Sequence, residues 1–268
     1  MDNRPIGVFD SGLGGLTGVR ELRKRLPNEN IVYFGDTGRV PYGSRSPETI
    51  LQYARQDIAF LLSKDVKCIM AACGTVSSIY PAAEAAKLPV PYLGVVDAAA
   101  REAAFVTRNR RIGVIGTAAT IRSRSYEKLL RQLVPGVEIF AQACPLFVPL
   151  VEEGFAKHSI TKEVIDIYLS EMKKTDIDTM ILGCTHYPLL RSSIREYFGE
   201  SVHIVNPAYE TAMDLKKVLA ENGMANPSEG EASYEFYVSD AAEKFTKFAD
   251  SILPYDVTTT KEVNIEEY

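Results

Sequence analysis

The hydrophobic pattern of the chain consists of short apolar runs separated by longer stretches whose apolar positions recur at helical spacing. Short runs of this kind predict strands buried on both faces. They stand at 6–10, 31–34, 66–73, 89–97, 112–116, 137–140, 177–183, 202–207 and 234–239. Between the first two runs, one helical stripe comprises Leu16, Val19, Leu22 and Leu26. Strands that alternate with amphipathic helices predict an α/β fold with mainly parallel sheets.

Two of the runs end in the same residue types. VKCIMAACGT (66–75) and IDTMILGCTHYP (177–188) each reach a small residue, a Cys and a Thr, and Cys73 aligns with Cys184 at an offset of 184 − 73 = 111. IGVFDSG and IGVIGTA are offset by 112 − 6 = 106, and IVYF parallels VEIF at the same offset. We therefore expect two similar halves, each with a Cys at the carboxyl end of the equivalent strand, where open parallel sheets bind ligands.

The order of the runs predicts two pseudo-symmetric three-layer α/β domains. We expect the first to comprise 1–97 plus 208–268, with a helix from Cys73 to about Lys87, and the second to comprise 98–207. The second half should restart with a helix at about Ala98. Residues 208–268 show only one strand-like run, so they should pack back on the first half.

Composition limits the classes of protein to consider. The chain has 268 residues, 46% apolar and 24% charged, which is ordinary for a globular protein. A net charge of −5 disfavours a nucleic-acid-binding surface. We expect no membrane span and no signal peptide. Four Cys without close-paired spacing indicate reduced thiols and a cytoplasmic protein.

Two thiols that meet across a cleft are compatible with three kinds of chemistry. In a zinc site, Cys73, Cys184 and His186 would supply three ligands, although the hydroxyl-rich turns are poor at completing it. A redox pair is another, but the chain has no CxxC. In the third, one thiolate removes a proton from a stereocentre and the opposing thiol supplies one to the other face. A duplicated site fits this reaction best, while Cys68 and Cys144 are expected to serve packing.

The turns after the strands carry further polar groups. Asp10 ends a buried strand, where a carboxylate needs a partner, a function or a helix to cap. The backbone N–H groups at Ser11 and Gly12 could cradle a carboxylate or a phosphate. Because the GxGxxG spacing is absent, the turn does not favour nucleotide binding.

Two other turns could face a ligand. Pro41, Tyr42 and Gly43 form a rigid bend that would present backbone and phenol, although surface packing explains Tyr42 as well. Thr117 and Thr120 occupy the turn that corresponds to Ser11. Their hydroxyls could hold a small polar substrate or cap the following helix.

Five motifs together resemble one family. DSGLGGLT, YFGDTGRVPYG, AACGT, CPLFVPLVEEG and GCTHYPLL are similar, in this order and over nearly the whole chain, to the glutamate racemases of the aspartate/glutamate racemase superfamily. The resemblance implies two α/β domains with the active site in the cleft between them. It implies interconversion of L- and D-glutamate without pyridoxal phosphate, other cofactors or metal, for peptidoglycan synthesis and cell shape in a bacterial cytoplasm. It also implies a homodimer.

The resemblance assigns roles by motif. Cys73 would deprotonate one enantiomer and Cys184 the other. Asp10 would assist the first thiol, and His186 and Glu152 the second. The substrate's carboxylates and ammonium would be held by Asp10, Ser11, Pro41, Tyr42, Gly43, Gly74, Thr75, Thr117, Thr120 and Thr185.

One position departs from the family pattern. The family usually has Cys-Asn-Thr at the first catalytic strand, and here Gly74 stands in place of the Asn. The Asn amide normally contacts the amino-acid head group, so a donor is missing or replaced. Losing a hydrogen bond to a charged group costs about 1.5–3 kcal/mol, so weaker binding or a changed substrate preference is expected, with activity retained because both thiols remain.

Two alternatives remain open on the sequence. One is a racemase of aspartate or another amino acid, and the other is a binding or regulatory relative without turnover, which the presence of both Cys argues against. Some racemases of this family also affect DNA gyrase, but the acidic composition gives that role no support here. A pyridoxal-phosphate enzyme is disfavoured because Lys67 lies before its strand.

Overall fold

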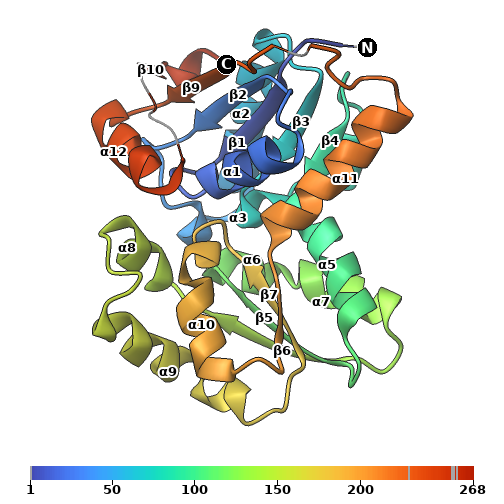
Figure 1. Ribbon diagram of the computed structural model, residues 1–268, viewed down its shortest axis with the longest axis vertical. Helices are drawn as coiled ribbons and strands as arrows, with labels where there is room; N and C mark the ends of the chain where they lie inside the picture. The colour runs from blue at the N-terminus through green and yellow to red at the C-terminus, as the bar shows by residue number, and fades with distance from the viewer. Residues whose placement is uncertain (1, 229, 255–256, 258) are drawn as a thin grey trace.

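The strands form two parallel sheets, one above the other in Figure 1. The computed structural model describes residues 2–228, 230–254, 257 and 259–268. Its strands are β1 (Ile6–Asp10), β2 (Ile31–Gly35), β3 (Cys68–Ala71), β4 (Tyr92–Gly94), β5 (Arg111–Gly116), β6 (Glu138–Ala143), β7 (Thr179–Gly183), β8 (His203–Val205), β9 (Tyr234–Val238) and β10 (Thr260–Glu262). The first sheet has the order β10-β9-β2-β1-β3-β4 and the second β6-β5-β7-β8. We call each sheet with its helices a lobe.

Helices cover both faces of each sheet (Figure 1). In the first lobe α2 packs on β1 and β2, while α1 packs against α11 and α12. In the second lobe α5 packs on β7 and β8, while α9 packs on β6 and against α10. The α-helices are α1 (Leu16–Arg25), α2 (Pro47–Ser63), α3 (Gly74–Ser77), α4 (Ala82–Ala85), α5 (Val95–Val106), α6 (Ala118–Ser123), α7 (Ser125–Leu133), α8 (Phe147–Glu152), α9 (Ser159–Lys173), α10 (Arg191–Phe198), α11 (Pro207–Glu221) and α12 (Ala242–Ile252). The 3₁₀ helices are η1 (Tyr42–Ser44), η2 (Tyr187–Leu190) and η3 (Ile265–Glu267).

The sheet order confirms the duplication. The sequence β2-β1-β3-β4 in the first sheet repeats as β6-β5-β7-β8 in the second, with β3 and β7 in equivalent places. Ile6 of β1 lies opposite Cys68 of β3, and Ile112 of β5 lies opposite Thr179 of β7. The equivalent residues of β3 and β7 are therefore offset by 179 − 68 = 111, as expected. On the other side, Ile31 of β2 and Ile139 of β6 occupy equivalent places, which is an offset of 139 − 31 = 108. This offset exceeds the 106 of the sequence alignment by two residues, so equivalent side chains still point to the same face of each sheet.

Three details differ from the sequence-based expectation. The helix expected from Cys73 to Lys87 is two short helices, because Pro81 cannot continue α3. Helix α5 begins at Val95, so the expected domain boundary after Asp97 falls inside it and stays a prediction. The carboxy-terminal stretch holds a second strand, β10, beside the expected β9.

The carboxy-terminal stretch packs back on the first lobe, as predicted. Strand β9 pairs in parallel with β2, and α11 lies against α1. Ser46 caps α2 ahead of Pro47 by accepting a hydrogen bond from the Thr49 N–H. Among the described residues, no helix is long and apolar enough to cross a membrane.

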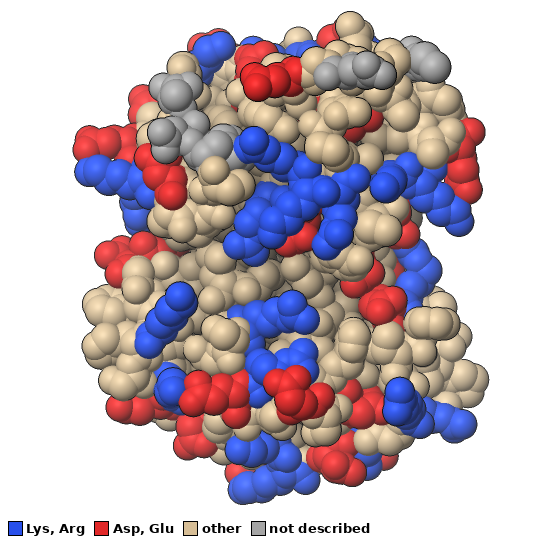
Figure 2. Space-filling model, viewed as in Figure 1, with Lys and Arg blue, Asp and Glu red and all other residues tan. Residues whose placement is uncertain are grey.

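Charged side chains of both signs cover the face shown in Figure 2. Lys and Arg gather near the centre of this view over α1, whose last turn carries Arg23, Lys24 and Arg25. Acidic side chains lie beside this basic group in the same view. The expectation that the protein does not bind nucleic acid is not tested by this surface and stays a prediction.

Candidate active site

A cavity of about 440 Å³ lies between the two lobes at the carboxyl ends of their strands. Both Cys73 and Cys184 line it, each one or two residues beyond the end of its strand. Other predicted site residues on its wall are Ser11, Pro41, Tyr42, Gly43, Gly74, Thr75, Thr117, Glu152, Thr185 and His186. The structure thus brings into one cavity groups that lie far apart in the sequence.

Cys73 occupies the N-cap position of α3 and is 3% exposed. Its Sγ lies 3.5 Å from Ser11 Oγ. Burial, and to a smaller extent the charge of Asp10, raise the pKa of the Cys73 thiol to about 12. Without a bound cation this thiol is therefore neutral at physiological pH.

Cys184 has a different set of neighbours. Its Sγ lies 3.9 Å from His186 Nδ1, and His186 Nε2 lies 3.1 Å from Glu152 Oε1. Lys244 of α12 reaches across from the first lobe to within 3.3 Å of Glu152 Oε2. The second thiol is therefore followed by a chain of alternating charged groups that ends at the surface.

The neighbours Cys184 and Glu152 determine the charge on His186. Burial alone would lower the pKa of His186, but hydrogen bonds with Cys184 and Glu152 outweigh burial and raise the pKa to about 10. Burial likewise opposes ionisation of Glu152, yet His186 and Lys244 lower the pKa of that carboxyl. An imidazolium beside a thiol favours negative charge on the sulfur.

Asp10 lies behind the cavity wall and not on it. It is 1% exposed, and its carboxylate accepts hydrogen bonds from Gly12 N–H (3.0 Å) and from Thr185 Oγ1 (3.3 Å). Burial raises the pKa of Asp10, and the charge of His186 opposes that shift. In this geometry Asp10 connects the turn of one lobe to the Cys184 loop of the other, and its predicted roles toward Cys73 and the substrate stay predictions.

The threonines combine both roles that the sequence left open. Thr117 lines the cavity, lies 2.9 Å from Thr75 across the cleft, and also caps α6 by accepting from the Thr120 N–H. Thr120 is 2% exposed and lies behind Thr117 at 3.0 Å, outside the cavity. The prediction that Thr120 contacts substrate therefore does not match this cavity, whereas Thr117 is well placed.

Tyr42 contributes its ring but not its hydroxyl to the cavity. The phenol donates to Asp36 and lies 3.1 Å from Asp57, both fully buried, and Arg39 pairs with both carboxylates. Burial and the two carboxylates raise the pKa of Tyr42. Buried carboxylates thus bind the hydroxyl, and a contact between Tyr42 and substrate stays a prediction that only the ring could meet in this geometry.

One wall of the cavity was not predicted from the sequence. It is apolar and consists of Val40, Ala118, Pro145, Val148 and Pro149. The signal was the motif CPLFVPLVEEG, in which the two prolines flank the start of α8. Ser44 also lines the cavity without having been predicted to, and Gly12 lines it with its N–H donated to Asp10.

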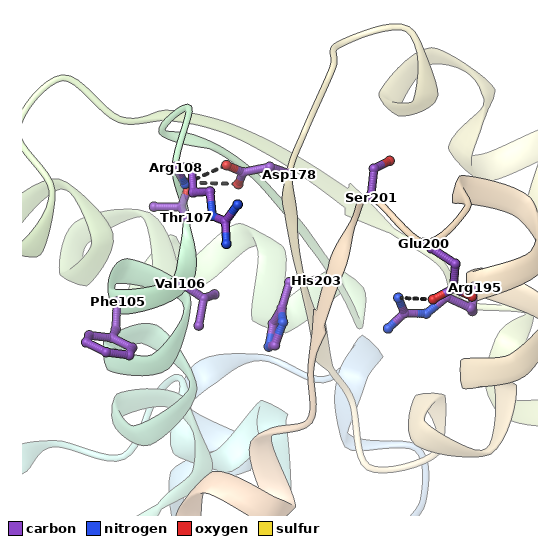
Figure 3. A pocket seen from close by; sticks show the side chains of 9 residues that line it. All are labelled: Phe105, Val106, Thr107, Arg108, Asp178, Arg195, Glu200, Ser201 and His203. Atoms are coloured by element: carbon purple, nitrogen blue, oxygen red, sulfur yellow. Dashed lines mark hydrogen bonds and ion pairs between the residues drawn. The ribbon is translucent and has the colours of Figure 1, made fainter.

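A larger hollow of about 620 Å³ lies at the other end of the second lobe (Figure 3). Its polar groups satisfy one another: Arg195 pairs with Glu200 at 3.2 Å, and Asp178 accepts from the backbone N–H of Arg108 at 2.6 Å. No predicted site residue lines it. Size alone does not make it a reaction site.

A metal-binding arrangement is not found among the described residues, where no group of three or more His, Cys, Asp and Glu side chains could hold an ion. All four cysteines are free. The zinc and redox interpretations of the paired thiols gain no support from these positions.

The match to known proteins is consistent with this geometry. The Asp/Glu/Hydantoin racemase family model matches residues 18–214. This chain belongs to that family. The racemase chain is 41% identical over 266 residues to a glutamate racemase of Geobacter metallireducens, covering 99% of this chain and 98% of the relative. It is 44% identical over 269 residues to that of Thermoanaerobacter pseudethanolicus, covering both chains fully.

Solved racemase structures share the whole fold. A glutamate racemase of Francisella tularensis in complex with D-glutamate superposes with a TM-score of 0.92 at 38% identity, covering 100% of both chains. An isoform from Bacillus anthracis gives a TM-score of 0.94 at 36% identity over 98% of each chain. The chain is therefore an amino-acid racemase, and its α/β architecture agrees with that of its relatives.

Proposed function

We propose that this racemase interconverts L- and D-glutamate by a two-base mechanism with Cys73 and Cys184 as the bases. The observation that carries the proposal is that two thiols from equivalent strands of the two lobes line one cavity. The full-length similarity to glutamate racemases supports glutamate as the substrate. The Francisella tularensis relative was crystallised in complex with D-glutamate, which supports the same substrate class for this chain.

The proton balance of the proposed reaction is symmetrical. One cysteine thiolate takes the Cα proton and becomes a thiol, leaving a carbanion. The opposite cysteine thiol then gives its proton to the other face of Cα and becomes a thiolate. Cys73 acts as base on one enantiomer and Cys184 on the other, so no cofactor, metal or oxidant is needed for the balance.

The groups around each thiol favour these charges in different ways. Asp10 and burial disfavour a Cys73 thiolate, so the substrate ammonium entering the cavity supplies the compensating positive charge. On the other side, His186 supplies a positive charge at 3.9 Å. Hydroxyls of Ser11 and Thr117 on the cavity wall can hold the substrate carboxylates and stabilise the developing carbanion, and Thr185 Oγ1, which donates to Asp10, can accept from the substrate ammonium.

The biological setting is proposed on the resemblance to the family. We infer that the product D-glutamate serves peptidoglycan synthesis in a bacterial cytoplasm and that the enzyme works as a homodimer. We also keep the division into 1–97 plus 208–268 and 98–207 as the domain organisation.

Proton NMR in D₂O tests the reaction. Purified protein is incubated with L-glutamate without added cofactor or metal, and the Cα–H signal and chirality are followed. Loss of the signal together with formation of D-glutamate is expected. Exchange or turnover of aspartate alone, or no exchange with any amino acid by protein that is folded, would refute the glutamate assignment.

A further inference from the structure

The two thiols are joined through a direct backbone contact between the lobes. Gly74, directly after Cys73, lies against Gly183, directly before Cys184. A Cβ built on Gly74 would lie closer than 3.0 Å to the Gly183 carbonyl oxygen, a separation that real Cβ atoms essentially never show. It would also lie 3.1 Å from the Gly183 carbonyl carbon and 3.7 Å from Cys184 Cα.

Gly183 has no room to retreat into its own lobe. A Cβ on Gly183 would lie 2.8 Å from the Ile115 carbonyl oxygen and 3.1 Å from Tyr126 Cε2. Tyr126 is buried, and β7 is paired with β5 along its length. A side chain at position 74 therefore has to push the lobes apart or displace the end of β7.

Further contacts join the two lobes beside Gly74 and Gly183, and we call this line of contacts the seam. Thr17 Oγ1 donates to the Thr185 carbonyl at 2.9 Å, and Thr75 lies 2.9 Å from Thr117. A Cβ on Gly14 would also overlap Thr185 Oγ1. Displacement at Gly74 would thus be transmitted to both Cys-bearing loops.

We propose that Gly74 is a positioning residue that sets the separation of the Cys73 and Cys184 thiols. This inference rests on the proposed two-thiol reaction. It also replaces the simpler expectation that an Asn at this position would only restore a missing donor, because the Gly183 carbonyl occupies the space that the Asn Cβ requires.

The chemistry makes thiol separation critical. Each thiol must reach Cα from its own side at about 3–3.5 Å, and a misplacement of about 1 Å can cost about 10²-fold in rate. When the second thiol is too far away, the carbanion is reprotonated from the first side. If the first thiol exchanges its proton with solvent before this return step, the substrate enantiomer acquires deuterium in D₂O without inversion.

The test compares Gly74→Ala and Gly74→Asn with Gly18→Ala. Gly18 is a helical glycine whose added Cβ would make an ordinary 3.4 Å contact with Ala72 Cβ. For each protein in D₂O, the rate of D-glutamate formation and the rate of deuterium gain by recovered L-glutamate are measured, with kcat, KM and the melting temperature.

We expect both Gly74 variants to lower kcat and to raise the ratio of exchange to racemisation on the order of tenfold, with Gly18→Ala unchanged. A merely structural role would lower both rates together and leave the ratio constant. An unchanged kcat and ratio in Gly74→Ala, or a lower KM with full kcat in Gly74→Asn, would overturn the inference.

Two further arms keep the outcome decisive. If Gly74→Ala does not fold, Gly14→Ala presses on the Cys184 loop from the first lobe and should raise the same ratio. Unfolding of both variants would assign the seam to folding and overturn the positioning role. An inactive but folded wild-type protein would refute the proposed function itself, which separates that failure from failure of the Gly74 inference.

Discussion

Cys73 and Cys184 occupy equivalent positions in the two sheets but have different neighbours. Ser11 is the hydrogen-bonding neighbour of one thiol, and His186 of the other. In the proposed reaction each direction begins with a different thiolate, so kcat can depend on pH differently in the two directions, whereas kcat/KM has to be equal in both because the two enantiomers have the same free energy.

Replacing either thiol should stop racemisation. We expect Cys73→Ser and Cys184→Ser each to lower the racemisation rate by about 10²–10⁴-fold, the usual contribution of a general base. Each variant retains the thiol for one enantiomer, so deuterium exchange should persist with opposite enantiomers in the two variants. Cys68→Ala is the control, because Cys68 is a buried thiol in β3 outside the cavity. Equal exchange of both enantiomers in one variant would contradict the assignment of faces.

Glu152→Gln should act through His186. Removing the carboxylate removes one of the groups that raise the pKa of His186, so this pKa should fall below about 10. The alkaline limb of the kcat profile should move to lower pH in the direction that starts with Cys184, and stay in place in the other direction. Histidine NMR titration and kcat profiles in both directions measure this. A shift of equal size in both directions would show that Glu152 does not act on one thiol alone.

At the scale of elements, helix α12 joins the two lobes at the rim of the site. Its residue Lys244 pairs with Glu152, whereas Lys247, one turn later, pairs within the helix with Glu243 at 2.7 Å. The carboxy-terminal stretch therefore completes the first sheet and also contacts the group that orients His186.

Lys244→Met should change kcat slightly, and only in the direction in which Glu152→Gln changes it. The Lys244 side chain is 55% exposed, so its ion pair contributes about 0.2–1 kcal/mol, which corresponds to a rate change below about fivefold. Lys247→Met is the matched control and should leave both directions unchanged. The kcat values in both directions at low and high salt provide the measurement, since screening should reduce the difference between Lys244→Met and the unchanged protein. An effect that is the same in both directions would argue against transmission through Glu152.

Whole-molecule stability should depend on pH through His186. Its pKa in the folded state is about 10, above the ordinary 6.5, so protonated His186 stabilises the fold fully below about pH 6.5 and progressively less as pH rises toward 10. We expect the melting temperature to fall between pH 6.5 and 8.5. His186→Asn should flatten this part of the curve, whereas His158→Asn, at an exposed helix N-cap, should not. Parallel curves for all three proteins would exclude the His186 contribution.

The sequence predicted what depends on local pattern and repetition. The buried strands, the duplicated order and the two thiols in one cavity follow from apolar runs that end in Cys. The sequence could not show that Asp10 and Thr120 lie behind the cavity wall, because adjacent positions in a turn differ in which way the side chain points. The sequence also could not show that the Tyr42 hydroxyl contacts Asp57, because that contact depends on how α2 packs against the preceding loop. The fit of Gly74 against Gly183 depends on how the lobes meet, which no local pattern encodes.

The first sheet is built from both ends of the chain, and this has a consequence for synthesis on the ribosome. Strand β8 completes the second sheet at Val205, whereas the first sheet needs β10, which ends at Glu262, 262 − 205 = 57 residues later. Until β9 emerges, β2 keeps an uncovered edge that can pair with other nascent chains. The later half of the chain thus completes its sheet before the earlier half, the reverse of the usual amino-terminal-first order.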